Sequence, residues 1–271
     1  MRRACFAVLV SVVPLAPGAA ERVLDFHSEL RVARDGALSV TEILTVQSDG
    51  GKVRGGVERR FALPLEELTV TRNGRPVPFE RERIAGGVRI RMRDASAVLQ
   101  PGEHEYRIAY RTARKIGFFE QHDELRWNVN GSGGELPFER LSAEVRLPEP
   151  VPAGELEVRA HTGSPGGRGR DYQAFVRPGS AALRVTRPLA PGEPFSIAVA
   201  FPKGVVAEPG LAERAAAWVD SHRALALALA VLLVLAVDLA LLSGFLRMIG
   251  SRIRAWSTSS PSSPPSRASA R

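Results

Sequence analysis

The chain has 271 residues, a formal net charge of +8 and a single cysteine. The basic surplus is uneven: the segment from Glu21 to Arg223 carries only +2, whereas the last 25 residues carry +5. A nearly neutral body argues against a nucleic-acid partner, and the single Cys5 excludes a disulfide framework, so an ordinary hydrophobic core must hold the body together.

Residues 1–20 have the pattern of a secretory signal peptide. Two arginines follow the initial methionine, an apolar run of ten residues comes next, and small residues at Gly18 and Ala20 suit cleavage before Glu21. We expect export of the segment that follows. An uncleaved membrane anchor is the alternative interpretation.

Between Glu21 and Val206, apolar and polar residues alternate in short segments, which is typical of half-buried strands. Asp35-Gly36 and Asn73-Gly74 have the composition of hairpin turns. We expect strands at 24–32, 38–46, 57–61, 68–70, 77–79, 88–92, 104–110, 125–129, 141–147, 156–160, 172–176, 183–186 and 195–201. Short strands with a turn every eight to twelve residues predict an all-β fold, an antiparallel β-sandwich.

The proline-rich stretch from Pro148 to Pro152 suggests an internal boundary. We therefore predict an exported β-sandwich domain over 21–148 and a second β-rich subdomain over 149–206. A similar Pro-Gly turn occurs in Leu99–Glu103 and in Leu189–Glu193, so the alternative of two related sandwich halves stays open.

The C-terminal part changes to helical composition. We predict a juxtamembrane helix over 207–223 and a transmembrane helix over 224–246, in which Asp238 is the one charged residue. Trp218 stands about one turn before this span, where an aromatic ring favours the headgroup layer. Three arginines follow the span and predict a cytoplasmic C-terminus: Arg247, Arg252 and Arg254. The serine- and proline-rich residues complete a basic tail over 247–271 that we expect to be disordered.

Several segments together resemble one family. They are Val40–Glu42 after Asp35-Gly36, Tyr106–Tyr110 after the next Pro-Gly turn, and Asp123–Gly131. This combination is similar to the bacterial predicted-membrane-protein family whose exported module is a domain of unknown function, type 2207. The resemblance covers roughly Glu21 to Val206. It implies an exported β-rich module tethered to the cell membrane, with no established catalytic residues. The one predicted span, 224–246, makes the chain a single-pass protein of the inner (cell) membrane.

No catalytic constellation is visible in the sequence. The five histidines are not paired at metal-ligand spacing, and no Gly-x-Ser-x-Gly motif is present. Gln121–Glu124 is the densest polar cluster, which either contributes metal ligands or forms an exposed loop. We expect neither a cofactor nor enzymatic activity. An envelope enzyme, such as a metal-dependent hydrolase, is the alternative.

Three residues are candidates for contact with a partner. Trp127 and Asn128 lie at the end of an expected strand, where Trp127 belongs either to the core or to the wall of a ligand groove. An aspartate inside a membrane costs about 2.5 to 3.5 kcal/mol on insertion scales, so Asp238 either meets a partner helix or is a tolerated acid near the cytoplasmic edge. We expect an interaction or assembly module of the cell envelope that contacts the lipid bilayer and envelope proteins. An accessory subunit of a transport or signalling complex is a further alternative.

Overall fold

The computed structural model describes residues 20–61, 65–93, 99–131, 135–163 and 169–257. The chain divides into two compact units, Met1–Glu208 and Pro209–Arg271. Apart from Ala20, the predicted signal peptide lies outside the described residues, as does 258–271 of the predicted tail.

The described part of the first unit consists of strands and two short 3-10 turns. Their bounds are β1 (Arg22–Val32), β2 (Leu38–Ser48), η1 (Lys52–Gly55), β3 (Val57–Phe61), β4 (Glu66–Arg72), β5 (Arg75–Pro76), β6 (Phe79–Ile84), β7 (Gly87–Met92), β8 (Gly102–Thr112), β9 (Ile116–Phe118), β10 (Asp123–Asn128), β11 (Leu141–Arg146), η2 (Ala153–Glu155), β12 (Glu157–Thr162), β13 (Tyr172–Arg177), β14 (Ser180–Val185) and β15 (Phe195–Phe201). The predicted all-β fold is confirmed.

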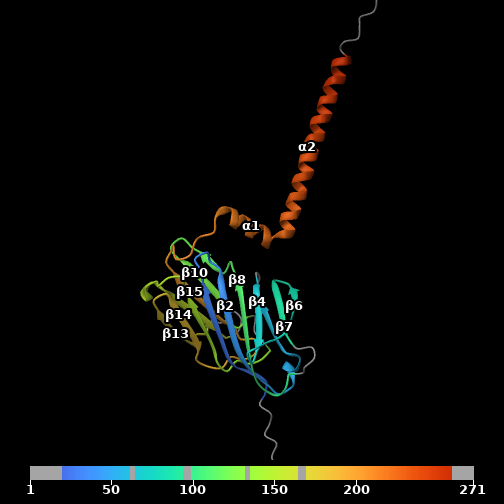
Figure 1. The fold of residues 1–271 in the computed structure, drawn as a ribbon. Helices are drawn as coiled ribbons and strands as arrows, with labels where there is room; N and C mark the ends of the chain where they lie inside the picture. The colour runs from blue at the N-terminus through green and yellow to red at the C-terminus, as the bar shows by residue number, and fades with distance from the viewer. Residues whose placement is uncertain (1–19, 62–64, 94–98, 132–134, 164–168, 258–271) are drawn as a thin grey trace, which may run out of the picture. The chain divides into compact units, whose positions relative to one another are not determined.

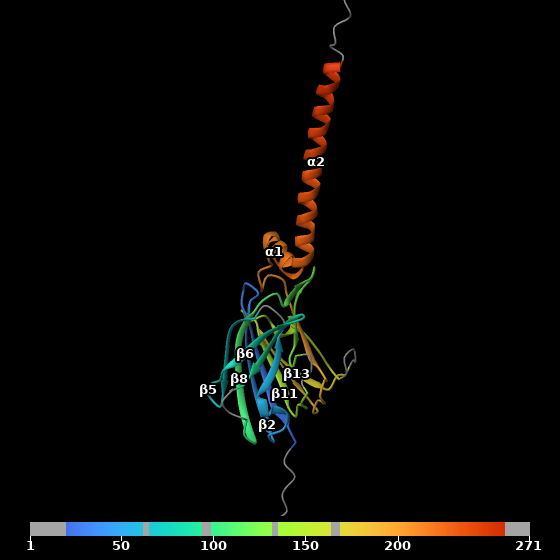
Figure 2. The same ribbon diagram turned by 90° about the vertical axis from the view of Figure 1, so that its right-hand side faces the viewer.

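These strands form three sheets. An eight-stranded sheet has the order β13-β14-β11-β1-β2-β8-β4-β5, a four-stranded sheet the order β12-β15-β10-β9, and a three-stranded sheet the order β3-β7-β6. Figure 1 shows β6 and β7 at one side of the unit and β10 and β15 at the other, and Figure 2 turns the first of these sides toward the viewer. The layer opposite the large sheet is therefore divided into two smaller sheets.

Local sequence explains the hairpins. Asp35 accepts a hydrogen bond from the amide of Ala37 at 2.9 Å and closes the turn between β1 and β2. Asn73 and Gly74 have φ angles of 50° and 75°, which suit the tight turn between β4 and β5. The described strand pairs are antiparallel except β1 and β11, which run parallel with Phe26 opposite Leu141.

Strands on both sides of Pro150 share sheets. β14 pairs with β11 in the large sheet, and both β12 and β15 belong to the same small sheet as β10. The first unit is accordingly one compact body, and the segments 21–148 and 149–206 contribute to the same core.

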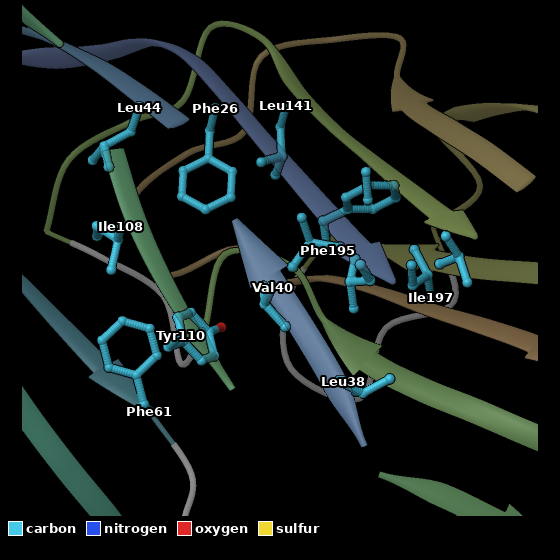
Figure 3. Close-up of a cluster of buried hydrophobic side chains, with 14 of the residues drawn as sticks. Phe26, Leu38, Val40, Leu44, Phe61, Ile108, Tyr110, Leu141, Phe195 and Ile197 are labelled. Carbon is cyan, nitrogen blue, oxygen red and sulfur yellow. The ribbon is translucent and has the colours of Figure 1, made fainter. Parts of the chain in front are cut away.

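One hydrophobic core lies between the large sheet and the two small ones. β2 directs alternate residues into it, among them Leu38, Val40 and Leu44, which are nearly inaccessible. Figure 3 shows Phe195 and Ile197 of β15 in the same buried cluster as Leu38 and Val40 of β2, and Phe61 of β3 against Tyr110 of β8. Both small sheets therefore cover the same face of the large sheet.

The second unit is helical. α1 spans Leu211–Ser221, and its first turn is closed by Glu213, which accepts a hydrogen bond from the amide of Gly210 at 3.1 Å. α2 spans Arg223–Ser257 and contains a 19-residue stretch, Leu225–Ser243, whose mean hydropathy of 2.9 is high enough to cross a membrane. The sequence-based prediction ended this helix at Leu246, but 247–257 contain no proline and remain helical.

Candidate ligand-binding site

A buried ion pair joins the large sheet to the three-stranded sheet. Glu42 of β2 and Arg59 of β3 are 1% and 8% exposed. Oε2 of Glu42 accepts a hydrogen bond from Nε of Arg59 at 2.9 Å and forms an ion pair with Nη2 at 2.7 Å. Oε1 of Glu42 accepts a hydrogen bond from the Tyr110 hydroxyl at 3.0 Å. Arg59 also donates to the carbonyl of Asn130 at 2.7 Å. Both carboxylate oxygens of Glu42 are therefore occupied.

Aromatic rings enclose this pair. The Arg59 guanidinium carbon lies 4.9 Å from the centre of the Phe26 ring and 5.6 Å from that of Phe61. Phe61 in turn packs edge to face on Tyr110, with ring centres 5.0 Å apart. Burial, followed by the negative charge of Glu42, raises the pKa of Tyr110 well above 10.0, so its hydroxyl stays a donor at neutral pH.

Next to this pair lies a cavity of about 420 Å³, which we call the Trp127 pocket. Its wall includes Phe61, Ile84, Tyr110, Lys115, Trp127 and Asn128. These residues come from β3, the β6–β7 hairpin, β8, the segment before β9, and β10, so both small sheets and the large sheet contribute. The pocket combines apolar rings with cationic and amide side chains.

Trp127 is half-buried and packs against the core, but its indole N–H has no hydrogen-bond partner. The same tryptophan also borders a second, more open hollow on the outer side of β10. Asn128 next to it is exposed. A buried donor without an acceptor is costly, by about 1–3 kcal/mol, so its presence on a residue that lines a cavity needs a reason.

Lys115 contributes a half-buried positive charge to the same wall. Burial lowers its pKa from 10.5, and no opposite charge offsets this effect. Its ammonium makes no ion pair with any described residue. By contrast, two other cations on the pocket wall are paired, Arg60 with Glu58 and Arg126 with Glu124. Hydrogen-bond donors are thus in excess on this wall.

A different cavity, of about 540 Å³, lies on the other side of Arg59 and Gly131. Its rim carries Arg91 of β7 and Arg93 just after this strand, and both are paired with acidic residues of other strands. Arg91 contacts Glu58 at 3.4 Å, and Arg93 pairs with Glu80. We therefore interpret these arginines as part of a paired, solvated sheet face rather than an anion site.

The predicted polar cluster Gln121–Glu124 does not converge. His122 stacks on Phe119, Asp123 pairs with Nζ of Lys203 at 2.8 Å, and Glu124 contacts Arg126 and Arg159. Asp123 and Glu124 are successive residues of one strand, so their side chains point to opposite faces. Within the described ranges, no three histidine, cysteine or acidic side chains gather as metal ligands.

The remaining predicted residues lie in the second unit. Trp218 on α1 is exposed and stacks on His222, with ring centres 5.1 Å apart. Asp238 is exposed within the apolar stretch of α2. Arg247, Arg252 and Arg254 continue α2 beyond that stretch, and their side chains lie outside the described part of the structure.

Two features of the site were absent from the sequence-based prediction. Glu42 and Arg59 occupy inward positions in otherwise apolar alternations, Val40-Glu42-Leu44 and Val57-Arg59-Phe61, so their spacing carried a usable signal for a buried ion pair. Lys115 carried no such signal, because the residues that line the cavity with it, such as Ile84 and Gly86, are distant in the chain.

Among solved structures, the chain is similar to parts of two hydrolases. The native yeast LTA4 hydrolase is 13% identical, with 67% of this chain and 29% of that chain covered and a TM-score of 0.43. The M1 zinc metallopeptidase from Deinococcus radiodurans is 15% identical, with 65% and 42% covered and a TM-score of 0.37. The chain thus spans less than half the length of either protein, and no curated protein matches it.

The family comparison gives a firmer result. Residues 22–201 match the family model described as "Predicted membrane protein (DUF2207) N-terminal domain". The match covers strands of all three sheets as well as the Trp127 pocket, and the helix suited to cross a membrane follows it. The chain belongs to this family of predicted membrane proteins.

Proposed function

We propose that the protein is a membrane-tethered binding module whose first unit lies outside the cytoplasm and captures a partner or ligand at the Trp127 pocket. The observation that carries this proposal is a formed cavity lined by Trp127, whose buried indole N–H has no hydrogen-bond partner, and by Lys115, whose half-buried ammonium has no ion-pair partner among the described residues. Unsatisfied polar groups cost stability, and a binding role gives them a reason to be there. Binding rather than catalysis is proposed because the pocket's one carboxylate, that of Glu42, is occupied at both oxygens.

Orientation follows from charge. Cationic residues close to a span are retained on the cytoplasmic side, and Arg247, Arg252 and Arg254 follow the apolar stretch of α2. This supports an inner-membrane protein with a cytoplasmic C-terminus and an exported first unit. The signal-like pattern of residues 1–20 supports the same orientation.

Labelling of introduced cysteines tests the orientation. In a Cys5→Ser background, Asn128→Cys should react in intact spheroplasts with a maleimide that cannot cross membranes. Ser262→Cys should react only after the membrane is permeabilised. The reverse pattern would exclude an exported pocket.

Photocrosslinking tests the binding role. A photoreactive amino acid at Asn128, at the exposed edge of the pocket, should form a discrete adduct in cells. The matched control is the same amino acid at Gln173, which is exposed on β13 in the large sheet. An adduct at Asn128 that is absent at Gln173 supports the proposal. Identical products from both positions, or none at Asn128, would contradict it.

Asp238 supports a second, lateral contact. An acid in the middle of an apolar stretch is costly in lipid, and a polar or basic group on a neighbouring helix would offset that cost. We therefore propose that α2 associates with another membrane helix through Asp238. Crosslinking from positions flanking Asp238 should give a product that Asp238→Leu abolishes. Recovery of monomer alone, unchanged in Asp238→Leu, would contradict the contact.

A further inference from the structure

The Trp127 pocket offers donors without matching acceptors. Its acidic lining residue, Glu42, already accepts from Arg59 and Tyr110. The indole N–H of Trp127 is buried without an acceptor, and the Lys115 ammonium has no carboxylate partner among the described residues. A ligand that satisfies this wall must therefore bring acceptor oxygens and, opposite an ammonium, a negative charge.

The rest of the wall restricts the ligand further. Phe61, Ile84 and Tyr110 present apolar surface, and Gly86 and Gly87 leave the hairpin side of the pocket without bulky side chains. A cavity of about 420 Å³ is in the range of small-molecule sites, or of one side chain with its flanking backbone. Small inorganic anions would leave the apolar wall without contacts.

We propose that the Trp127 pocket binds a carboxylate attached to a short apolar body, with the Lys115 ammonium and the Trp127 indole N–H as its donors. This inference rests on the proposed binding role and specifies the chemistry of what is bound. The carboxylate belongs either to a free organic acid or to a peptide, through an acidic side chain or the C-terminus. These are sources of one chemistry, and the experiment distinguishes them.

The neighbouring cavity shows why Lys115 is singled out. Arginines on that rim form ion pairs with Glu58 and Glu80, so their positive charge is already neutralised. At Lys115 the charge is half-buried and unmatched. An incoming carboxylate gains more at a charge that is partly shielded from water and has no partner than at a paired charge, because the interaction is then less screened.

Fluorescence provides a direct readout on the full-length protein in nanodiscs of neutral lipid. The chain has three tryptophans. In a Trp218→Phe, Trp256→Phe background, Trp127 becomes the one remaining reporter. The probes are 4-methylpentanoate, its isosteric neutral amide 4-methylpentanamide, and two acetylated peptides, one ending in a leucine carboxylate and the other in the matching leucine amide. A third peptide carries an internal glutamate and an amidated end.

We expect 4-methylpentanoate to change Trp127 emission in a saturable way, and the amide to have no such effect at the same concentrations. Lys115→Met should weaken this binding about tenfold or more, the effect of losing a hydrogen bond to a charged group. Lys115→Arg should restore most of it. The matched control, Lys52→Met, removes a lysine that does not line the Trp127 pocket and should leave binding within about twofold.

The possible results separate the hypotheses. Equal binding of acid and amide, or binding unaffected by Lys115→Met, overturns the carboxylate assignment. Tighter binding of either carboxylate-bearing peptide than of 4-methylpentanoate identifies a peptide source, and the reverse identifies a free acid. If no carboxylate binds while Asn128 still forms its specific adduct, this inference fails and the binding module stands. If that adduct is also absent, the proposed function itself fails.

Discussion

Two polar regions lie side by side in the first unit, and they differ in how completely their groups are paired. In the Glu42–Arg59 ion pair, each carboxylate oxygen has a partner, and Arg59 also reaches the carbonyl of Asn130. In the adjoining wall of the Trp127 pocket, the indole N–H and the Lys115 ammonium have no partner in the described part of the chain. A fully paired group holds sheets together, whereas an unpaired one is available to a ligand.

Removing one member of the ion pair should have the largest effect. Arg59→Met leaves Glu42 charged and buried without its partner, and loss of one member of a buried pair costs about 3–5 kcal/mol. We expect a loss of that size in the free energy of unfolding, measured by urea denaturation of the full-length protein. The double variant Glu42→Leu, Arg59→Met should recover much of it, since no charge remains buried. A loss below about 1 kcal/mol in the single variant would show that the pair does not hold the sheets.

Removing the Tyr110 hydroxyl, the other hydrogen-bond partner of Glu42, should cost less stability. Tyr110→Phe leaves Oε1 of Glu42 without its donor, which costs about 1–3 kcal/mol. The same denaturation assay at neutral pH measures this loss. Tyr172→Phe is the control, because Tyr172 is only half-buried and lies on β13 in the same large sheet. Equal losses of unfolding free energy in both variants would show that the hydrogen bond from Tyr110 to Glu42 adds no particular stability.

Tyr110→Phe should also change how stability depends on pH. The pKa of Tyr110 in the folded protein is above its ordinary value of 10.0. The protonated hydroxyl therefore contributes fully to stability below pH 10.0, and this contribution declines as the pH rises through the folded-state pKa. Between pH 8 and pH 11, stability of the unsubstituted protein should fall more steeply than that of Tyr110→Phe. Parallel curves would contradict this assignment.

Gly131 stands where the two regions meet. Its φ angle is +74°, and an added Cβ would lie 3.4 Å from Nη1 of Arg59. Gly131→Ala should cost about 1–3 kcal/mol from its left-handed backbone, with a further loss from crowding the guanidinium. Gly74→Ala is a matched control, because Gly74 has φ +75° with nothing within 4 Å of the added atom. The difference between these two variants, measured by urea denaturation, reports the contacts of the added Cβ with Nη1 of Arg59 and with the Arg60 carbonyl oxygen, which lies 3.5 Å away.

Particular residues show how far sequence reasoning reaches. Alternation along Leu38, Val40 and Leu44 predicted a strand and its buried face, and Asn73-Gly74 predicted a hairpin. Alternation of apolar and polar residues identifies a strand but not the strand that pairs with it. The parallel pairing of β1 with β11 and the division into three sheets therefore followed only from the structure. Trp127 was identified with two alternatives, and the structure places it against the core and at a pocket wall together. The helical continuation to Ser257 was missed because arginines mark the edge of a membrane and not the end of a helix.

Lys115→Met should have the smallest effect on stability, and in the opposite direction. Because burial lowers the pKa of Lys115 in the folded protein, its ammonium destabilises the fold at neutral pH, and an apolar side chain of similar length removes that cost. As the pH rises through the lowered folded-state pKa toward 10.5, the folded protein releases this proton while the unfolded chain keeps it, so the unsubstituted protein gains stability. The urea midpoint of Lys115→Met should therefore lie slightly above that of the unsubstituted protein at pH 7, and the gap should close at higher pH. A midpoint that falls at pH 7 would show that Lys115 has a structural partner, which would place it with the paired groups around Glu42 and remove it from the ligand side of the pocket.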